Sequence, residues 1–173
     1  NEKARRVQLL LMDVDGVLTD GRISYVPSGD SLEEVKSFDV ADGTGVTLAH
    51  WAGLATGIIS GRSSRSVVER ARELDIEEVH VGIRDKSAVL DDIINARSIS
   101  AENVAFIGDD VVDLSAMRRV GFPVAVANAS DEVKPHAAYV TSACGGQGAV
   151  REVIELILKA QGKWGSLMDE LLK

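Results

Sequence analysis

The sequence predicts an α/β fold, a doubly wound three-layer domain built around a mostly parallel β-sheet. Short apolar runs rich in β-branched residues alternate with segments in which apolar residues recur every three or four positions. This alternation is typical of βαβ units, whose helices cover both faces of a parallel sheet. The hydrophobic content of 45% in 173 residues is sufficient for one core, so we expect a single domain over residues 1–173.

The expected elements follow one another in regular order. The strands are the apolar runs Val7–Met12, Leu54–Ile59, Glu78–Val81, Val104–Ile107, Val124–Val126 and Ala138–Thr141. The helices are expected near residues 43–53, 63–74, 85–97, 111–119 and 147–161. We expect Trp51 and Phe106 in the core, and in the tail, residues 162–173, a short helix that packs on another subunit.

One stretch interrupts the alternation. Residues 22–38 have the pattern of a β-hairpin, because two extended runs flank a turn of Pro27, Ser28, Gly29 and Asp30. Proteins of this layout often insert a separate lid domain at this point. The hairpin is far too short for one, so we expect a domain without a cap.

Composition and charge exclude several kinds of partner. The formal net charge of −8 leaves no surplus of basic groups for binding nucleic acid. Cys144 is the single cysteine, which rules out an intrachain disulfide and a thiolate zinc cluster. No run approaches the ~20 apolar residues that span a bilayer. We therefore expect a cytoplasmic protein with neither nucleic acid nor membrane as partner.

Polar residues follow several of the expected strands, where ligands bind in open α/β sheets. Asp13 and Asp15 follow the first strand, and Ser60 follows the second. Lys86 opens the next helix, and Asp109 follows the fourth strand. Since loops are polar in general, one such residue means little, but this ordered set indicates a common site.

Phosphoryl transfer through a covalent intermediate requires this set of side chains. A carboxylate such as Asp13 can attack phosphorus only if a divalent cation offsets the repulsion between them. Asp13 and Asp109 offer the hard oxygen ligands that Mg²⁺ prefers. Lys86 and the Ser60 hydroxyl can hold the transferring oxygens, and Asp15 can donate a proton to the leaving alcohol.

These residues resemble a known set of motifs. Asp13 to Val17, Ile59 to Arg62, Lys86, and Ile107 to Asp113 resemble, in order, the four motifs of the haloacid dehalogenase superfamily of phosphatases. The chain is further similar to the capless branch typified by 3-deoxy-D-manno-octulosonate 8-phosphate phosphatases, including the glycine-rich residues 145–152. The resemblance implies Mg²⁺-dependent hydrolysis of a small sugar-acid phosphate, with the octulosonate 8-phosphate as best guess, in lipopolysaccharide biosynthesis.

The resemblance also implies residue roles. Asp13 would be the nucleophile, Asp15 the general acid/base and a metal ligand through its backbone carbonyl, and Asp109 a metal ligand, while Asp110 or Asp113 would orient metal-bound water. The implied substrate contacts are Asp15, Asp39, Asp42, Gly43, Arg62, Arg70 and Lys86. The family resemblance implies a homotetramer in which the hairpins associate and the glycine-rich segment reaches a neighbouring active site.

Two departures from the branch bear on the substrate. Thr47 stands where members usually carry an arginine, and Asp39 and Ala41 stand where they often have asparagine and arginine. Less positive charge is then available to a sugar-acid carboxylate. A nine-carbon, sialic-acid-like 9-phosphate is therefore an alternative substrate.

Other interpretations remain open at the level of the sequence. The chain could be a phosphotransferase or a non-catalytic oligomerisation domain. A phospho-receiver module is disfavoured, because the strands ending at Ile59 and Val81 are not followed by the aspartate that such modules phosphorylate. Individually, Ser60 could be a helix N-cap, Lys86 a solvated helix residue, and Asp110 a cap. Arg70 could belong to an exposed charged face.

Overall fold

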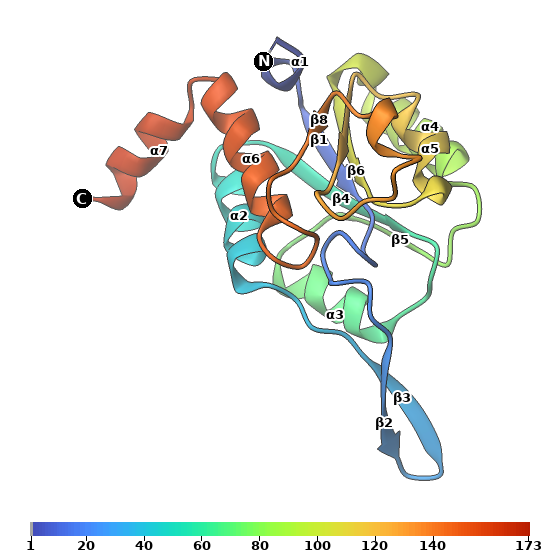
Figure 1. The fold of residues 1–173 in the computed structure, drawn as a ribbon. Helices are drawn as coiled ribbons and strands as arrows, with labels where there is room; N and C mark the ends of the chain where they lie inside the picture. Colours follow the sequence, from blue (N-terminus) through green and yellow to red (C-terminus); the bar gives the residue numbers. More distant parts are fainter. Residues whose placement is uncertain (1) are drawn as a thin grey trace.

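The computed structural model describes residues 2–173, and its centre is a six-stranded sheet with the strand order β5-β4-β1-β6-β7-β8 (Figure 1). Every pair of neighbouring strands in this sheet is parallel. The strands are β1 (Leu9–Met12), β4 (Ala55–Ser60), β5 (Glu78–Val81), β6 (Val104–Gly108), β7 (Phe122–Ala125) and β8 (Tyr139–Val140). The expected α/β fold with a mostly parallel sheet is confirmed.

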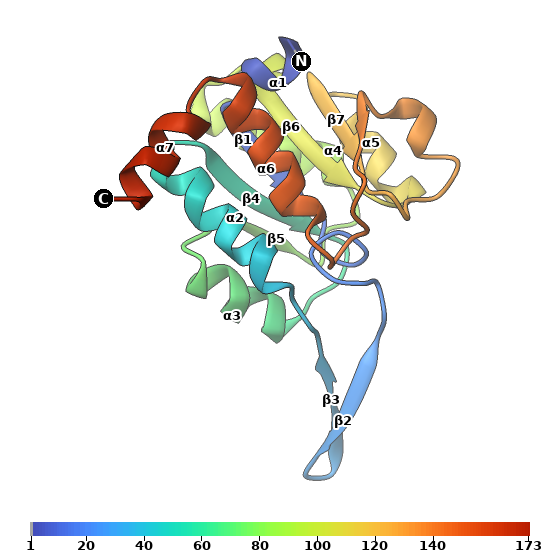
Figure 2. The same cartoon turned by 60° about the vertical axis from the view of Figure 1, so that its left-hand side comes forward.

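Helices cover both faces of the sheet. They are α1 (Glu2–Arg5), α2 (Val40–Trp51), α3 (Arg65–Glu73), α4 (Lys86–Arg97), α5 (Leu114–Met117), α6 (Ala149–Ala160) and α7 (Trp164–Leu171). Three short 3₁₀ helices are η1 (Ala101–Asn103), η2 (Val111–Asp113) and η3 (Lys134–His136). Figures 1 and 2 show α2, α3 and α6 on one face and α4 and α5 on the other. Within residues 2–173, none of these helices combines the length and apolarity needed to cross a membrane.

The core lies between these layers. All residues of β1 and β6 are buried, because these two central strands have neighbours on both sides and helices above and below. Phe106 in β6 is fully buried, as expected. The expectation for Trp51 is wrong, since its side chain is 62% exposed. It lies on the stripe of α2 that includes Val40 and Thr44, opposite the face that packs on the core.

Several expected elements differ in their bounds, and two of these differences have a local cause. The strand expected at 124–126 begins at Phe122, because Pro123 joins the sheet and its carbonyl accepts a hydrogen bond from the N–H of Ala138 (2.8 Å). The helix expected at 111–119 is split into η2 and α5. A reciprocal capping box between Asp110 and Asp113 stabilises the tight first turn.

The hairpin consists of β2 (Ser24–Ser28) and β3 (Ser31–Val35), paired antiparallel with Ser28 opposite Ser31. The hairpin follows β1 and projects from the body of the molecule beyond the carboxyl end of that strand (Figures 1 and 2). No other insertion follows β1, and residues 2–173 contain no cap domain. Five large hydrophobic side chains of the hairpin region are exposed, namely Ile23, Tyr25, Val26, Leu32 and Val35.

Candidate active site

The expected strand-end residues converge on one cavity at the carboxyl ends of β1, β4 and β6. The cavity has a volume of about 300 Å³, and its lining includes Asp13, Asp15, Ser60, Arg62, Lys86, Asp109 and Asp110. Strand β1 lies between β4 and β6, where the direction of chain winding reverses, and open sheets bind ligands at such a point. The order of elements therefore brings together residues far apart in sequence, such as Asp13 and Asp110, which are 97 positions apart.

Lys86 is the central cation of the cavity. Its side chain is 2% exposed, and its Nζ lies 2.9 Å from an oxygen of Asp13 and 2.7 Å from an oxygen of Asp113. Asp85 caps α4 by accepting hydrogen bonds from the backbone of Ser87 and Ala88, which places Lys86 in the first turn. The alternative of a solvated helix residue is therefore wrong.

Asp113 organises the loop that follows β6. It is fully buried, and its second oxygen accepts hydrogen bonds from the N–H groups of Asp109 (2.9 Å) and Asp110 (3.3 Å). Asp110 caps η2 by accepting a hydrogen bond from the N–H of Val111 (2.7 Å). The alternative prediction that Asp110 is a helix cap is therefore confirmed. The loop that presents Asp109 to the cavity is thus fixed by side chain to backbone hydrogen bonds.

The electrostatics of the cavity are dominated by buried acids. Burial, followed by the charge of Asp113, raises the pKa of Asp13 from 3.8 to about 6, although Lys86 opposes the change. Burial and the charges of Asp113 and Asp13 raise the pKa of Asp109 to about 7. Burial works to lower the pKa of Lys86, but Asp113 and Asp13 outweigh it, so that pKa is raised. A further cation beside Lys86 would stabilise the ionised carboxylates of Asp13, Asp109 and Asp113.

These acids fit a divalent metal ion. Asp13, Asp109 and Asp113 each offer a carboxylate oxygen within 4.8 Å of the others. An all-oxygen donor set suits a hard cation such as Mg²⁺, and the mutual repulsion of the carboxylates is what such a cation relieves. The side chain of Asp113 joins this group, whereas that of Asp15 does not. The metal-ligand role expected of Asp15 involves its backbone carbonyl, and it stays a prediction.

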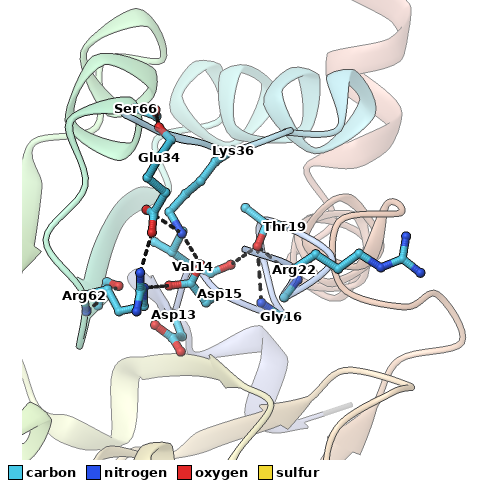
Figure 3. Close-up of polar contacts among 12 residues, drawn as sticks. Asp13, Val14, Asp15, Gly16, Thr19, Arg22, Glu34, Lys36, Arg62 and Ser66 are labelled. Carbon is cyan, nitrogen blue, oxygen red and sulfur yellow. Dashed lines mark hydrogen bonds and ion pairs between the residues drawn. The ribbon is translucent and has the colours of Figure 1, made fainter. Parts of the chain in front are cut away.

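The carboxylate of Asp15 faces the hairpin instead (Figure 3). It forms an ion pair with Lys36, and its other oxygen lies 3.8 Å from Nε of Arg62. Glu34 contacts the same two cations. Glu34 and Lys36 were not predicted from the sequence as site residues. Their spacing of two on an expected strand nevertheless places them on one face, where the chain returns toward Asp15.

Glycines allow the first loop to pack closely. Gly16 has a φ of +87°, and a Cβ at this position would overlap the carboxylate of Asp109. A Cβ at Gly145 would overlap the carbonyl of Gly16, and the N–H of Gly146 donates to the carbonyl of Val17 (2.9 Å). The glycine-rich segment therefore packs on the loop that follows β1 in its own chain. Its expected contact with a neighbouring subunit stays a prediction.

Ser60 lies at the end of β4 and is 1% exposed. Its hydroxyl oxygen lies within hydrogen-bonding distance of the N–H of Arg62 (3.4 Å), in the lining of the cavity. The residue at the N-cap of α3 is Ser64, so the alternative that Ser60 is a helix cap is wrong.

Four expected substrate contacts lie outside this cavity: Asp39, Asp42, Gly43 and Arg70. Asp39 caps α2, and Asp42 is 1% exposed and accepts hydrogen bonds from the N–H groups of Gly148 (3.3 Å) and Arg151 (2.8 Å). Arg70 packs over the ring of Phe38 and pairs with Glu73 (3.1 Å), and it lies close to Gly43. Within one chain these residues therefore cap α2 and connect it to α3 and α6.

Comparison with known proteins identifies the family. Residues 78–154 match the family model of haloacid dehalogenase-like hydrolases. Over 161 residues, the chain is 44% identical to the 3-deoxy-D-manno-octulosonate 8-phosphate phosphatase KdsC of Escherichia coli K12, covering 93% of this chain and 84% of the relative. This chain belongs to the haloacid dehalogenase-like hydrolases. Within that family its relatives are phosphoric monoester hydrolases, and the expected enzyme class is confirmed.

Solved structures of haloacid dehalogenase-like hydrolases agree with the fold. The Moraxella catarrhalis 3-deoxy-D-manno-octulosonate 8-phosphate phosphatase, in complex with a magnesium ion, a phosphate ion and KDO, is 40% identical, with a TM-score of 0.94 over 98% of this chain and 96% of that one. The cobalt-bound Haemophilus influenzae phosphatase is 38% identical, with a TM-score of 0.87, over 93% of this chain and 92% of that one.

Proposed function

We propose that this chain is a Mg²⁺-dependent phosphatase that hydrolyses 3-deoxy-D-manno-octulosonate 8-phosphate. The observation that carries the proposal is the 44% identity to the Escherichia coli phosphatase over 93% of the chain. The Moraxella structure, which holds magnesium, phosphate and KDO, supports both the cofactor and the substrate class. Asp13 and Asp109 would hold the ion through their carboxylates, and Asp15 through its backbone carbonyl. Asp113, whose oxygens already contact Lys86 and the N–H groups of Asp109 and Asp110, would orient metal-bound water, a role that Asp110 could share.

The geometry supports a role for each side chain in the first half of the reaction. Asp13 attacks the phosphorus atom and displaces the sugar alcohol, so that a phosphoaspartate forms on Asp13. When bound, Mg²⁺ supplies positive charge that offsets the repulsion between carboxylate and phosphate. Lys86 stays paired with Asp13 and adds a fixed cation, and the hydroxyl of Ser60 donates to a phosphate oxygen. Asp15 gives its proton to the departing alkoxide.

In the second half, the same carboxylate works in reverse. Asp15 accepts a proton from the water that attacks the phosphorus atom of the phosphoaspartate, and Asp13 is released as a carboxylate. Arg62 lines the cavity with a side chain that is 44% exposed, so it is available to the substrate's own anionic groups. We assign it to substrate binding.

A phosphate-release screen tests this function. Purified protein with Mg²⁺ is given eight- and nine-carbon sugar-acid phosphates, with phosphoserine and phosphoglycolate as outgroups. We expect the highest kcat/KM with the octulosonate 8-phosphate and loss of turnover in Asp13→Asn. Asp131→Asn, whose side chain is 97% exposed on the surface, is the matched control and should behave as wild type.

The screen also separates the alternatives. A preference for a nine-carbon 9-phosphate would support the second substrate, consistent with the departures at Asp39, Ala41 and Thr47. A preference for an outgroup would contradict the sugar-acid assignment. The absence of any Mg²⁺-dependent release, with Asp13→Asn unchanged from wild type, would contradict phosphatase function and favour a non-catalytic oligomerisation domain. Burst kinetics with an acceptor alcohol would identify a phosphotransferase.

We also propose that the protein works in the cytoplasm as a homotetramer assembled through the hairpins. The exposed apolar side chains of the hairpin support this, because Leu32 is 69% and Tyr25 56% exposed on a two-stranded ribbon. Isolated two-stranded ribbons are marginally stable, and burying such side chains against other copies would stabilise the hairpin.

A further inference from the structure

The base of the hairpin contributes two charged residues to the active site without lining its cavity. We propose that Lys36 and Glu34 are positioning residues for the reaction, with Lys36 orienting Asp15 and Glu34 orienting Arg62. The inference rests on the proposed phosphatase function and goes beyond it, because it makes the hairpin part of the catalytic apparatus as well as a surface for assembly.

Four side chains form a closed ring of alternating charge (Figure 3). Lys36 pairs with one oxygen of Asp15 and lies 3.2 Å from an oxygen of Glu34. Arg62 pairs with the other oxygen of Glu34 and lies 3.8 Å from the second oxygen of Asp15. Each carboxylate thus contacts two cations, and each cation contacts two carboxylates.

Lys36 is the most deeply buried member of the ring. Its side chain is 1% exposed, compared with 16% for Glu34, 22% for Asp15 and 44% for Arg62. A buried ammonium group is costly unless it is paired, and Lys36 has partners in two carboxylates. Because Lys36 and Glu34 are absent from the cavity lining, they reach the reacting atoms only through Asp15 and Arg62.

The ring fixes the two residues that do line the cavity. Asp15 must present one oxygen to the leaving group, and contacts with Lys36 and Arg62 restrict the rotation of its carboxylate. Arg62 is a long, flexible side chain, and its contact with Glu34 reduces the entropy lost when substrate binds. The hydroxyl of Ser66 in α3 also lies 3.5 Å from the carbonyl of Glu34, which connects the hairpin base to the body of the molecule.

Lys36→Met tests the link to Asp15. The variant is compared with wild type on two esters, the octulosonate 8-phosphate and p-nitrophenyl phosphate, in the presence of Mg²⁺. The sugar leaves as a poor alkoxide that needs a proton, whereas the nitrophenolate leaves without one. A misplaced general acid should therefore lower kcat/KM about 100-fold with the sugar phosphate and less than about 10-fold with the aryl phosphate. Equal losses on the two esters would overturn the role of Lys36.

Glu34→Gln tests the link to Arg62. We expect KM for the sugar phosphate to rise about tenfold, the cost of a lost hydrogen bond to a charged group, with kcat within about twofold of wild type. Glu33→Gln is the matched control, because Glu33 is the exposed neighbour on the same strand. In an Arg62→Gln background, Glu34→Gln should add less than about a twofold effect, because both act through one contact. The role of Glu34 would be overturned if Glu34→Gln left KM unchanged, or if it raised KM as much in the Arg62→Gln background as in the wild type.

Melting temperature and sedimentation are recorded for each variant, because a merely structural role would change them while leaving the ratio between the two esters untouched. If the wild-type protein hydrolyses neither ester, both the proposed function and this inference fail. If the wild type is active and the variants show no change in leaving-group ratio or in KM, this inference alone fails.

Discussion

At the scale of single residues, the site depends on how closely the backbone of the first loop approaches the carboxylate of Asp109. Gly16 is in the left-handed region at φ +87°, and any side chain at this position would displace Asp109. Asp109 is in turn fixed through its backbone by Asp113. The spacing between Asp13, the proposed nucleophile, and Asp109, a proposed metal ligand, therefore depends on a glycine that has no side chain of its own.

Gly16→Ala should lower kcat/KM by at least about 100-fold, because a misplacement of about 1 Å in a catalytic group has that effect. Gly29→Ala is the matched control. Gly29 also has a positive φ, +59°, but nothing lies within 4 Å of a Cβ there. Backbone strain should lower the melting temperature of both variants, as thermal denaturation measures. Only Gly16→Ala should lose activity and Mg²⁺ affinity. Equal activity of the two variants would contradict the contact with Asp109.

Mg²⁺ should stabilise the protein in a pH-dependent way. The folded pKa values of Asp13 and Asp109, about 6 and about 7, exceed the ordinary value of 3.8. These two groups therefore favour the folded state at low pH, and that contribution is lost as pH rises from 3.8 through about 7. The metal competes with protons for the same oxygens, so it should raise Tm clearly at pH 8 and little at pH 5. Calorimetry with and without Mg²⁺ measures this, and an equal rise at both pH values would contradict the acidic site.

The residues that could be predicted from the sequence are those whose position follows from the fold class. Asp13 and Asp109 each follow a strand and Ser60 is the last residue of one, and parallel strands end at one edge of the sheet. Lys36 and Glu34 could not be placed in this way, because the path of a hairpin outside the sheet is not determined by strand order. The burial of Lys36 depends on where that ribbon returns to the first loop.

At the scale of elements, α6 is joined to α2 by a buried carboxylate. Asp42 in α2 accepts hydrogen bonds from the N–H groups of Gly148 and Arg151 at the start of α6, where no side chain of α6 itself acts as a cap. Gly45 lies against Arg151, so the two helices approach closely. A sequence pattern could indicate that Asp42 is special but could not distinguish a substrate contact from a cap between helices.

Asp42→Ala should lower the free energy of unfolding by about 1–2 kcal/mol, the usual cost of a lost helix cap. Asp42→Asn keeps an oxygen acceptor and should cost less. Urea denaturation measures both, and KM for the sugar phosphate should not change if Asp42 acts only through α6. A rise in KM without loss of stability would instead favour the substrate contact that the family resemblance implied.

At the scale of the whole molecule, the hairpin and α7 extend from the body, at well-separated points (Figures 1 and 2). The α/β class, the order of the elements and the hairpin could be predicted, because periodicity and turn residues encode them locally. The division of the chain as one domain over residues 1–173 stays a prediction. How copies of the chain assemble depends on surfaces that no local pattern specifies.

Leu32→Asp should convert the proposed homotetramer to smaller species, because it places a charge on the most exposed apolar side chain of the hairpin. Val140→Asp, on an exposed valine of the edge strand β8, is the control and should leave the assembly intact. Analytical ultracentrifugation measures the mass of both variants. A wild-type monomer, or a Leu32→Asp tetramer, would contradict assembly through the hairpin.

The central claim is that Asp13 carries the phosphoryl group during turnover. The most direct measurement is to quench the enzyme during hydrolysis of the octulosonate 8-phosphate, reduce it with borohydride and analyse its peptides by mass spectrometry. Because borohydride reduces an acyl phosphate to the alcohol, we predict homoserine at position 13, dependent on both substrate and Mg²⁺. Homoserine at another aspartate, or an unmodified Asp13 in enzyme quenched while turning over, would contradict the account.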